Sequence, residues 1–345
     1  ISGGGGGGGG ARGKGKGKGE DNHARLLERI SSEVNRLRFF QGKGKHLKFI
    51  QQLEPRIEAV EAKLARAVKS ALAAAIRTRS VVALGHCLHA YTAVGRVREA
   101  EEAVRTQLVA PAVRAVLKAA PPAAALGARE DLAPLLTSCA DAALKACAIE
   151  LELTRDVQSG LAAQYNLLAN AVLAEVDTQL AAARPAAYSP GVPDAFHRNH
   201  GAALALVDAL EARIVTRASL ALFRASPALL SYTKRWNLSV YFTLRFQDIA
   251  GSLEAEMDAQ GLVQAGQDAA GNQEGGRLTR EGEGHGAGDV RFLLAPTAAA
   301  WAALRRCWAS DVFTAQIADR FVRLTAQIIS RYCGWLAAGV DALGS

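Results

Sequence analysis

The chain has 345 residues, of which 50% are hydrophobic and 6% aromatic, with a formal net charge of +8. This length is enough for two or three domains or one long helical array, and abundant alanine, the best helix former, favours helices throughout. No run approaches the roughly 18 apolar residues of a membrane-spanning helix, and the glycine- and lysine-rich start is unlike a secretory signal.

The positive charge is concentrated in two short clusters. These clusters contain Arg12, Lys14, Lys16 and Lys18, and then Lys43, Lys45 and Lys48. The rest of the chain is close to neutral, because its other Lys and Arg residues are nearly balanced by 33 Asp and Glu residues. A basic nucleic-acid-binding face is therefore only weakly indicated, since such a face needs Lys and Arg distributed over one surface.

The cysteines are odd in number and form no Cys-x-x-Cys pair, which predicts reduced, buried thiols in a cytosolic protein. They are Cys87, Cys139, Cys147, Cys307 and Cys333. Because the sequence begins with Ile1 and its single methionine is Met257, we expect it to be a fragment of a longer protein.

In chain order, residues 1–22 are a low-complexity run of glycine followed by alternating Gly and Lys, which we expect to be disordered. The segment from Gly8 to Lys14 resembles a phosphate-binding loop only superficially, because Gly15 replaces the required Ser or Thr and no strand precedes it. Two amphipathic helices follow, with apolar residues three and four apart, on either side of a glycine-containing turn at 41–45. This pattern predicts an antiparallel helical hairpin.

Residues 23–183 are predicted to form an N-terminal helical bundle that begins with this hairpin. Three prolines make residues 184–194 an irregular joint, and a central bundle is expected over 195–258. Residues 259–289 have almost no apolar side chains and are predicted to be a disordered insertion. Helices over 290–345 are expected to pack on the central bundle. The predicted fold class is therefore all-α, an elongated rod of successive helical hairpins and bundles.

The most aromatic stretch spans residues 234–254. Its apolar and polar residues alternate as in a strand, whereas a helix would place apolar side chains around most of its circumference. We predict a helix from about Trp236 to Met257, because no other stretch offers a partner strand and a lone strand leaves its backbone groups unpaired. The predicted core residues are Trp236, Leu238, Val240, Phe242, Phe246, Ile249 and Leu253.

Few groups could carry chemistry. His86, Cys87 and His89 could ligate a metal from one helix, but no further ligand cluster is evident, and a helix surface is the simpler interpretation. The same holds for His197 and His200, where a polar helix start is the simpler interpretation. No Gly-x-Ser-x-Gly motif supports a Ser/His/Asp site, so no catalytic residue, metal or cofactor is predicted.

Two segments could bind a partner. The Gly-Lys arm within residues 1–22 could bind nucleic acid or anionic lipid by charge alone, although a solubilising segment is the simpler interpretation. A basic-aromatic cluster could contact a protein, although helix-end packing with arginines extending to solvent is the simpler interpretation. This cluster consists of Trp301, Arg305, Arg306 and Trp308.

Several blocks of sequence resemble, in the same order, those of the subunit 2 family of the conserved oligomeric Golgi complex. The most distinctive are residues 236–242, WNLSVYF, and residues 244–254, LRFQDIAGSLE. The other blocks are residues 33–39, 86–91, 100–101, 109–111, 165–170, 189–196, 301–308 and 324–332. The resemblance runs from about Glu33 to Tyr332. Residues 1–22 and 259–289 match nothing in the family, and the family's N-terminal coiled-coil region is absent.

The resemblance implies a subunit of a vesicle tether on the cytosolic face of the Golgi, which serves retrograde transport within the Golgi. It implies helical-rod architecture, partner subunits 1, 3 and 4 in the same lobe, and no catalysis or cofactor. The competing hypotheses are a helical protein that binds nucleic acid or anionic lipid through the basic arm, and an all-helical enzyme.

Overall fold

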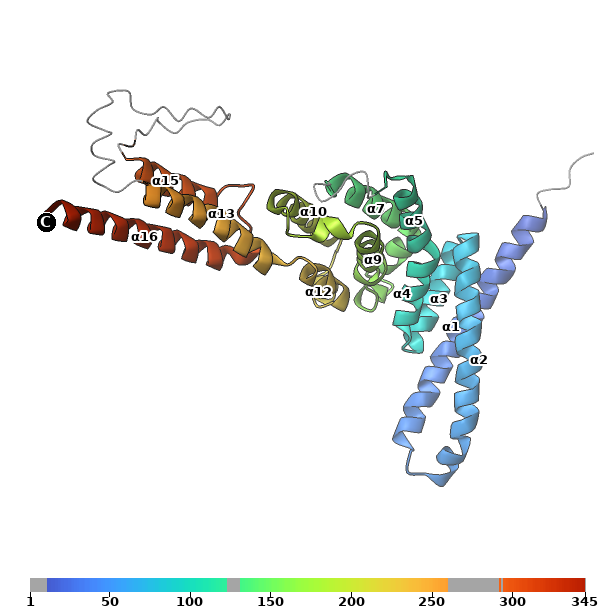
Figure 1. Cartoon of the computed structure of the whole chain (residues 1–345). Helices are drawn as coiled ribbons and strands as arrows, with labels where there is room; N and C mark the ends of the chain where they lie inside the picture. The colour runs from blue at the N-terminus through green and yellow to red at the C-terminus, as the bar shows by residue number, and fades with distance from the viewer. Residues whose placement is uncertain (1–10, 123–130, 260–291, 293, 345) are drawn as a thin grey trace, which may run out of the picture. The chain divides into compact units, whose positions relative to one another are not determined.

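Every regular element of the described chain is a helix, which confirms the all-α prediction (Figure 1). The computed structural model describes residues 11–122, 131–259, 292 and 294–344. These residues divide into two compact units, which we call the N-terminal and C-terminal units. The N-terminal unit comprises residues 11–122, 132–185 and 202–235, and the C-terminal unit comprises mainly residues 186–201, 236–259 and 294–344.

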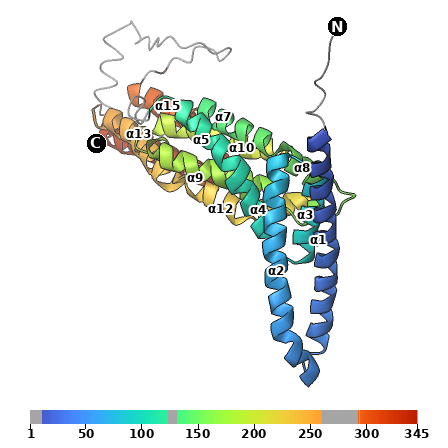
Figure 2. The same ribbon diagram turned by 90° about the vertical axis from the view of Figure 1, so that its right-hand side faces the viewer.

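The N-terminal unit begins with a long helical hairpin on which a third helix packs. Helices α1 (Ala11–Lys43) and α2 (Lys48–Thr78) run antiparallel, and α3 (Val81–Ala93) lies against both (Figures 1 and 2). Apolar residues spaced three and four apart on each helix face the other two, as amphipathic helices require. The buried residues include Leu27, Val34, Leu64, Val68, Leu72, Leu84 and Leu88.

Helix α1 begins at Ala11, inside the segment 1–22 that the composition predicts to be disordered. The prediction is wrong for the backbone from Ala11 onward, and residues 1–10 lie outside the described residues. Nucleating a helix is costly, whereas each added residue contributes one hydrogen bond. Packing on α3 and a 2.6 Å hydrogen bond from Ser80 Oγ to Asp21 Oδ1 fix the following turns. The helix can therefore continue toward the N-terminus through the glycines.

The remainder of the N-terminal unit is a bundle of shorter helices. One continuous helix consists of α4 (Val97–Val104), the π-helical turn η1 (Arg105–Val109) and α5 (Ala110–Ala119). A second consists of the π-helical η4 (Leu168–Leu173) and α9 (Ala174–Ala183). The others are α7 (Ala133–Ala146), α8 (Ala148–Arg155), η3 (Leu161–Ala163), the second part of α10 (Pro193–Glu211), α11 (Arg217–Arg224) and α12 (Pro227–Lys234).

The π-helical turn η1 has a local cause. The backbone N–H of Ala110 donates to the carbonyl of Arg105, five residues earlier. The next residue, Pro111, has no N–H with which to continue the α-helical pattern. The wider π-helical turn before the proline accommodates the missing hydrogen bond, so that the helix continues into α5.

Three helices of the C-terminal unit pack on one another. They are α13 (Leu238–Ala259), α15 (Ala295–Cys307) and α16 (Ala318–Gly344). The unit also contains the first part of α10 (Pro193–Glu211), most of the turn η5 (Pro185–Tyr188) and the turn η6 (Ala315–Ile317).

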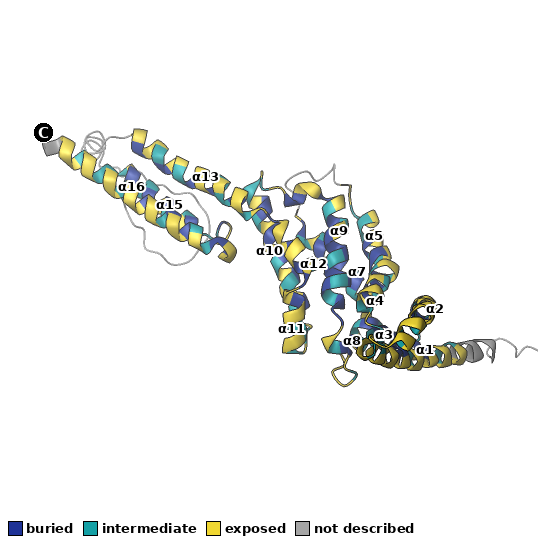
Figure 3. Cartoon of the chain, turned by 90° about the horizontal axis from the view of Figure 1, so that it is seen from below, coloured by how far each residue is buried: buried dark blue, intermediate teal, exposed yellow. Residues whose placement is uncertain are grey.

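Helix α13 confirms the helical interpretation of the aromatic stretch, but it turns a different face to the core. Trp236, Ile249 and Leu253 are buried, and Leu238 and Phe242 are half-buried. Val240 and Phe246 are 42% and 38% exposed, so the structure places these two predicted core residues at the surface. The buried face of a helix recurs every three or four residues and cannot follow alternation (Figure 3). Its buried residues are Tyr241, Arg245, Ile249, Leu253 and Met257.

The two units follow the chain differently from the predicted domains. The change from one unit to the other between Pro185 and Ala186 falls within the predicted joint 184–194. The predicted central bundle, residues 195–258, contributes to both units. The proposed insertion 259–289 lies outside the described residues, apart from Ala259 at the end of α13.

Candidate interaction surfaces

The most exposed aromatic side chains in the described part of the C-terminal unit lie on α15 (Ala295–Cys307) and directly after its last residue. Trp301 and Trp308 are 46% and 47% exposed, and Arg305 lies between them and is also exposed. Trp301 and Arg305 are four residues apart on one face of α15, and Trp308, the C-cap, lines the same shallow groove. Leu304 and Ala302 contribute to the shallow groove that they line. We call Trp301, Arg305 and Trp308 the α15 surface.

The opposite face of α15 explains why these side chains point outward. Ala300, Ala303 and Cys307 are buried, and they too are three and four residues apart. Small side chains at these positions allow the helix to pack closely against α13 and α16. Helical periodicity therefore holds Trp301 and Arg305 on the solvent side.

Trp308 is fixed in place although it is exposed. Its indole Nε1 donates a 3.1 Å hydrogen bond to Thr325 Oγ1 on α16, and its ring lies 5.2 Å from that of Phe313. A partner that covers Trp308 would lose little side-chain entropy on binding, because the ring is already ordered.

Arg306 differs from its neighbours in the predicted cluster. It is half-buried, and its guanidinium lies 2.7 Å from Asp311 Oδ2. This hydrogen bond lowers the pKa of Asp311. The structure thus brings Trp301, Arg305 and Trp308 together and commits Arg306 to an ion pair within the unit.

An aromatic cluster lies in the core of the same unit. The ring of Phe196 lies 5.5 Å from Trp236 and 5.3 Å from Tyr241. Tyr241 donates a 2.6 Å hydrogen bond to the carbonyl of Val312, in the segment that follows α15, and burial raises the pKa of its hydroxyl. Arg245 donates a 3.2 Å hydrogen bond to the same hydroxyl. These contacts fix the chain immediately after the α15 surface.

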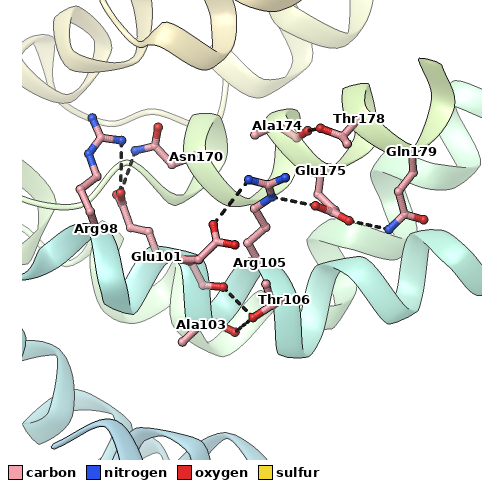
Figure 4. Close-up of polar contacts among 11 residues, drawn as sticks. Arg98, Glu101, Ala103, Arg105, Thr106, Asn170, Ala174, Glu175, Thr178 and Gln179 are labelled. Carbon is pink, nitrogen blue, oxygen red and sulfur yellow. Dashed lines mark hydrogen bonds and ion pairs between the residues drawn. The ribbon is translucent and has the colours of Figure 1, made fainter. Parts of the chain in front are cut away.

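A polar network joins the two π-containing helices of the N-terminal unit (Figure 4). The buried Glu101 carboxylate accepts hydrogen bonds from the backbone N–H of Asn166 at 2.6 Å and from Asn170 Nδ2 at 2.8 Å. One turn along, Arg105 Nε donates to Glu175 Oε2 at 2.7 Å. Buried charges need such partners, because leaving one unpaired is strongly destabilising. The network therefore fixes how the two helices pack, which is a structural role.

Glu150 is a buried carboxyl with a weaker environment. It is fully buried in the first turn of α8, and neither carboxyl oxygen accepts a hydrogen bond from another described residue. Arg79 Nη1 lies 3.7 Å away. Burial raises the pKa of Glu150, because the charged form loses its hydration.

The first group of possible metal ligands has other roles. His86 Nδ1 lies 2.5 Å from Glu28 Oε2, across α3 and α1. Cys87 is buried, and burial raises the pKa of its thiol to about 12. A thiol in this environment stays protonated, whereas a metal ligand must be a thiolate. Among the residues that the structure describes, no group of three or more His, Cys, Asp and Glu side chains could hold a metal ion.

The second histidine pair belongs to the aromatic cluster. His197 Nε2 lies 2.9 Å from the carbonyl oxygen of Phe313. His200 is buried between Phe196 and Trp236, with ring centroids 6.2 Å and 5.5 Å away. Burial lowers the pKa of His200 to about 4. Both histidines therefore contribute to packing within the C-terminal unit.

A cavity of about 240 Å³ lies in the N-terminal unit between α8, η3, η4 and the segment leading into α11. Its lining is mixed, with Leu151 and Leu168 among the apolar side chains and Arg155 and Ser219 among the polar ones. The Ser219 hydroxyl donates to the carbonyl of Ala162 at 2.7 Å, and no histidine is among the described residues that line the cavity. This arrangement does not assemble a serine nucleophile with a base.

A second exposed apolar cluster lies where α1 turns into α2. Phe39, Phe40 and Phe49 are 62%, 61% and 66% exposed, and Leu47 is also exposed. We call residues 39–49 the hairpin tip. This surface was not predicted from the sequence. The absence of Asp and Glu from residues 34–53 was the available signal.

No helix within the described ranges is long and apolar enough to cross a membrane.

The comparisons with known proteins agree with one another. Residues 234–345 match a family model described as "COG complex component, COG2, C-terminal". The chain is 32% identical over 322 residues to "Conserved oligomeric Golgi complex subunit 2" of Arabidopsis thaliana, which covers 93% of this chain and 40% of the relative. The human protein of that name is 29% identical over 316 residues, covering 89% of this chain and 39% of the relative.

The Drosophila melanogaster protein of the same name is 25% identical over 322 residues, covering 91% of this chain and 42% of the relative. The chain thus spans about two fifths of the length of the curated relatives that it matches. No solved structure matches the chain. Relatives from a plant and two animals share the same name and the same extensive alignment with this chain, and the family model covers its C-terminal third. Residues 234–345 therefore belong to the C-terminal domain family of conserved oligomeric Golgi complex subunit 2, and the chain is similar to subunit 2 proteins of that complex over 89–93% of its length.

Proposed function

We propose that the chain is a non-catalytic structural part of a subunit of the Golgi vesicle-tethering complex, where it supports retrograde transport within the Golgi. The observation that carries this proposal is the similarity over 93% of the chain to a protein named as subunit 2 of that complex. The fold agrees with it, since the described residues form packed helices whose buried polar groups serve packing.

The proposed partners are other subunits of the same complex, in particular subunits 1, 3 and 4. The α15 surface is the proposed contact, because exposed tryptophan and arginine side chains are enriched at the centres of protein interfaces, and one of its tryptophans, Trp308, is held by a hydrogen bond. The protein would then work peripherally on the cytosolic face of the Golgi membrane, with a cytosolic pool.

The proposed mechanism is geometric. Helices that pack in rigid groups hold their exposed surfaces at fixed positions relative to one another. Within the C-terminal unit, the Tyr241 hydrogen bond to Val312 and the Trp308 hydrogen bond to Thr325 fix the α15 surface before a partner arrives. A tether subunit needs this property, because its binding sites must keep their spacing under load.

The test is co-purification of the full-length protein that contains this chain. Tagged wild-type protein should recover subunits 1, 3 and 4, and Trp301→Ser combined with Arg305→Glu should reduce their recovery at least about tenfold, since two central contacts are each worth over 1 kcal/mol. The matched control is Val322→Ser with Ile329→Ser, two exposed apolar residues of α16, which should leave recovery unchanged.

Circular dichroism of each variant would show that the helices are intact. Wild-type protein that recovers none of the other subunits would contradict the proposed function. Normal recovery by the α15 variant would contradict the assignment of the contact and leave the function standing.

A further inference from the structure

We propose that the hairpin tip docks on the surface of an anionic lipid bilayer, with its phenylalanines in the interfacial region and its lysines among the headgroups. The inference goes beyond the proposed function and does not depend on it, because assembly with partner subunits does not require direct contact with lipid. It rests on the apolar exposure, the charge and the geometry of residues 39–49.

The hairpin tip exposes four large apolar side chains to solvent. Phe39, Phe40 and Phe49 are each more than 60% exposed, and Leu47 is 51% exposed. The Phe39 ring has local neighbours: the Phe40 ring lies 5.7 Å away, and Lys43 Nζ lies over the Phe39 ring, 5.6 Å from its centroid. Large apolar side chains clustered at one exposed site are typical of a surface that contacts a membrane or a partner protein.

The directions of these side chains favour lipid over a protein groove. Phe39 and Phe40 are adjacent on a helix and point about 100° apart. Leu47 lies in the turn, and Phe49 lies on α2. The apolar groups therefore surround the end of the hairpin. A protein groove receives a stripe of residues three and four apart, whereas a fluid interface accommodates a convex end from all sides.

The charge around the tip selects an anionic surface. Residues 34–53 contain five Lys and Arg residues and no Asp or Glu. Arg36 pairs with Glu33 at 3.2 Å, and Arg38 pairs with Glu61. No ion pair involves the three lysines of the tip and its flank in the part of the chain that the structure describes. These cations are Lys43, whose Nζ lies over the ring of Phe39, and Lys45 and Lys48.

The hairpin presents the tip without depending on it. α1 and α2 continue past the region covered by α3, so the tip lies at the end of the hairpin distant from α3 (Figures 1 and 2). Val34, Ile57 and Leu64 are buried in the part of the hairpin between the tip and α3. Substitutions at the exposed phenylalanines and lysines leave these contacts in place, so the variants are expected to fold.

The experiment measures binding of the whole 345-residue chain to vesicles by co-sedimentation. One set of vesicles contains phosphatidylcholine with phosphatidylserine, and the other contains phosphatidylcholine alone. We expect binding to the anionic vesicles only, weakened by added salt, because the charges act over a Debye length.

Two tip variants separate charge from apolar contact. Neutralising the three lysines, as Lys43→Gln, Lys45→Gln and Lys48→Gln, should weaken binding roughly 100-fold, at about fivefold per lysine near an anionic surface. The triple change Phe39→Ser, Phe40→Ser and Phe49→Ser should weaken it at least about tenfold, through the lost burial of apolar area.

Matched controls use exposed residues elsewhere in the N-terminal unit. Val81→Ser with Val82→Ser removes exposed apolar area at the start of α3, and three exposed lysines provide the charge control. The charge control is Lys69→Gln, Lys118→Gln and Lys145→Gln. Both controls should bind vesicles like the wild type, and circular dichroism should show equal helix content in all variants.

Three results would overturn the proposal. The first is equal binding of the wild type to neutral and anionic vesicles, or none to either. The second is loss of binding on deletion of residues 1–22 with the tip intact, which would assign binding to the Gly-Lys arm. The third is that the tip variants bind vesicles normally but no longer bind single-stranded RNA or a partner subunit, which would identify the tip as a nucleic-acid or protein interface.

Discussion

The buried histidine of the C-terminal unit should make that unit sensitive to acid. His200 is 5% exposed and lies between the rings of Phe196 and Trp236. Its pKa is lowered from 6.5 to about 4, first by burial and then by the nearby His197. In the unfolded chain the imidazole is hydrated and takes up a proton at its ordinary pKa.

The sign and the size follow from this difference. Below pH 6.5 the unfolded chain binds a proton at His200 that the folded chain does not bind until about pH 4, so the free energy of unfolding falls as the pH falls. The full effect is about 3 kcal/mol, of which about 2 kcal/mol is reached by pH 5, at 1.36 kcal/mol for each pH unit. This is a large part of the stability of a small unit.

Urea unfolding followed by tryptophan fluorescence measures this effect, because all four tryptophans belong to the C-terminal unit. Between about pH 7.5 and pH 5, the wild type should lose about 2 kcal/mol more than His200→Phe, which keeps a ring against Phe196 and cannot take up a proton. His46→Gln, at an exposed histidine of the hairpin tip, should keep the wild-type pH dependence. Equal pH dependence of His200→Phe and the wild type would refute the reasoning.

Three further predictions concern single side chains. Ile249→Ala should lower the free energy of unfolding by about 2–5 kcal/mol and Phe246→Ala by much less, since only the Ile249 substitution leaves a buried cavity. Similar losses for the two variants in urea unfolding would contradict the orientation of α13. Tyr241→Phe should cost about 1–3 kcal/mol, because the carbonyl of Val312 loses its buried donor, and an unchanged melting temperature would exclude that role. Glu150→Gln should raise the free energy of unfolding by about 1–3 kcal/mol at about pH 8 and by less at about pH 5, because the folded state disfavours the charged carboxyl. Unfolding followed by circular dichroism measures this change. A lower free energy of unfolding at about pH 8 would show that the charge is well paired.

Helical periodicity was sufficient to predict the hairpin and the fold class. Of the residues of α1 and α2 that recur at three and four positions, the structure buries Leu27, Val34, Ile57 and Leu64, whereas Ile30, Leu37 and Val60 are exposed. The agreement at the buried positions has a simple cause, since a long amphipathic helix has one apolar face and must bury it. The resemblance to the Golgi complex subunit came from ordered blocks of residues, which no physical pattern in the composition could have supplied.

The aromatic stretch shows where the sequence was insufficient. Its apolar residues surround the helix, so the sequence could not tell which would be covered, and Val240 and Phe246 proved to be exposed. Tyr241, which interrupts the alternation, is fully buried because its hydroxyl reaches the carbonyl of Val312. The partner atom is 71 residues away in the chain, and such a contact leaves no local trace in the sequence.

The candidate surfaces were predicted unevenly for the same reason. Trp301 and Arg305 follow from helical spacing once α15 is known, whereas the commitment of Arg306 to Asp311 depends on the conformation of the segment after α15. The hairpin tip could have been found from its charge, but the exposure of Phe39 required knowledge of where α3 stops covering the hairpin.

The central proposal is that this chain serves vesicle tethering at the Golgi through contacts between subunits. The most direct measurement is rescue in cells that lack their own subunit 2, with the full-length protein expressed and the position of a Golgi glycosylation enzyme followed by microscopy. The wild type and the Val322→Ser, Ile329→Ser control should return the enzyme to the Golgi, and the Trp301→Ser, Arg305→Glu variant should not. Stable expression of the wild type without any return of the enzyme would contradict the account.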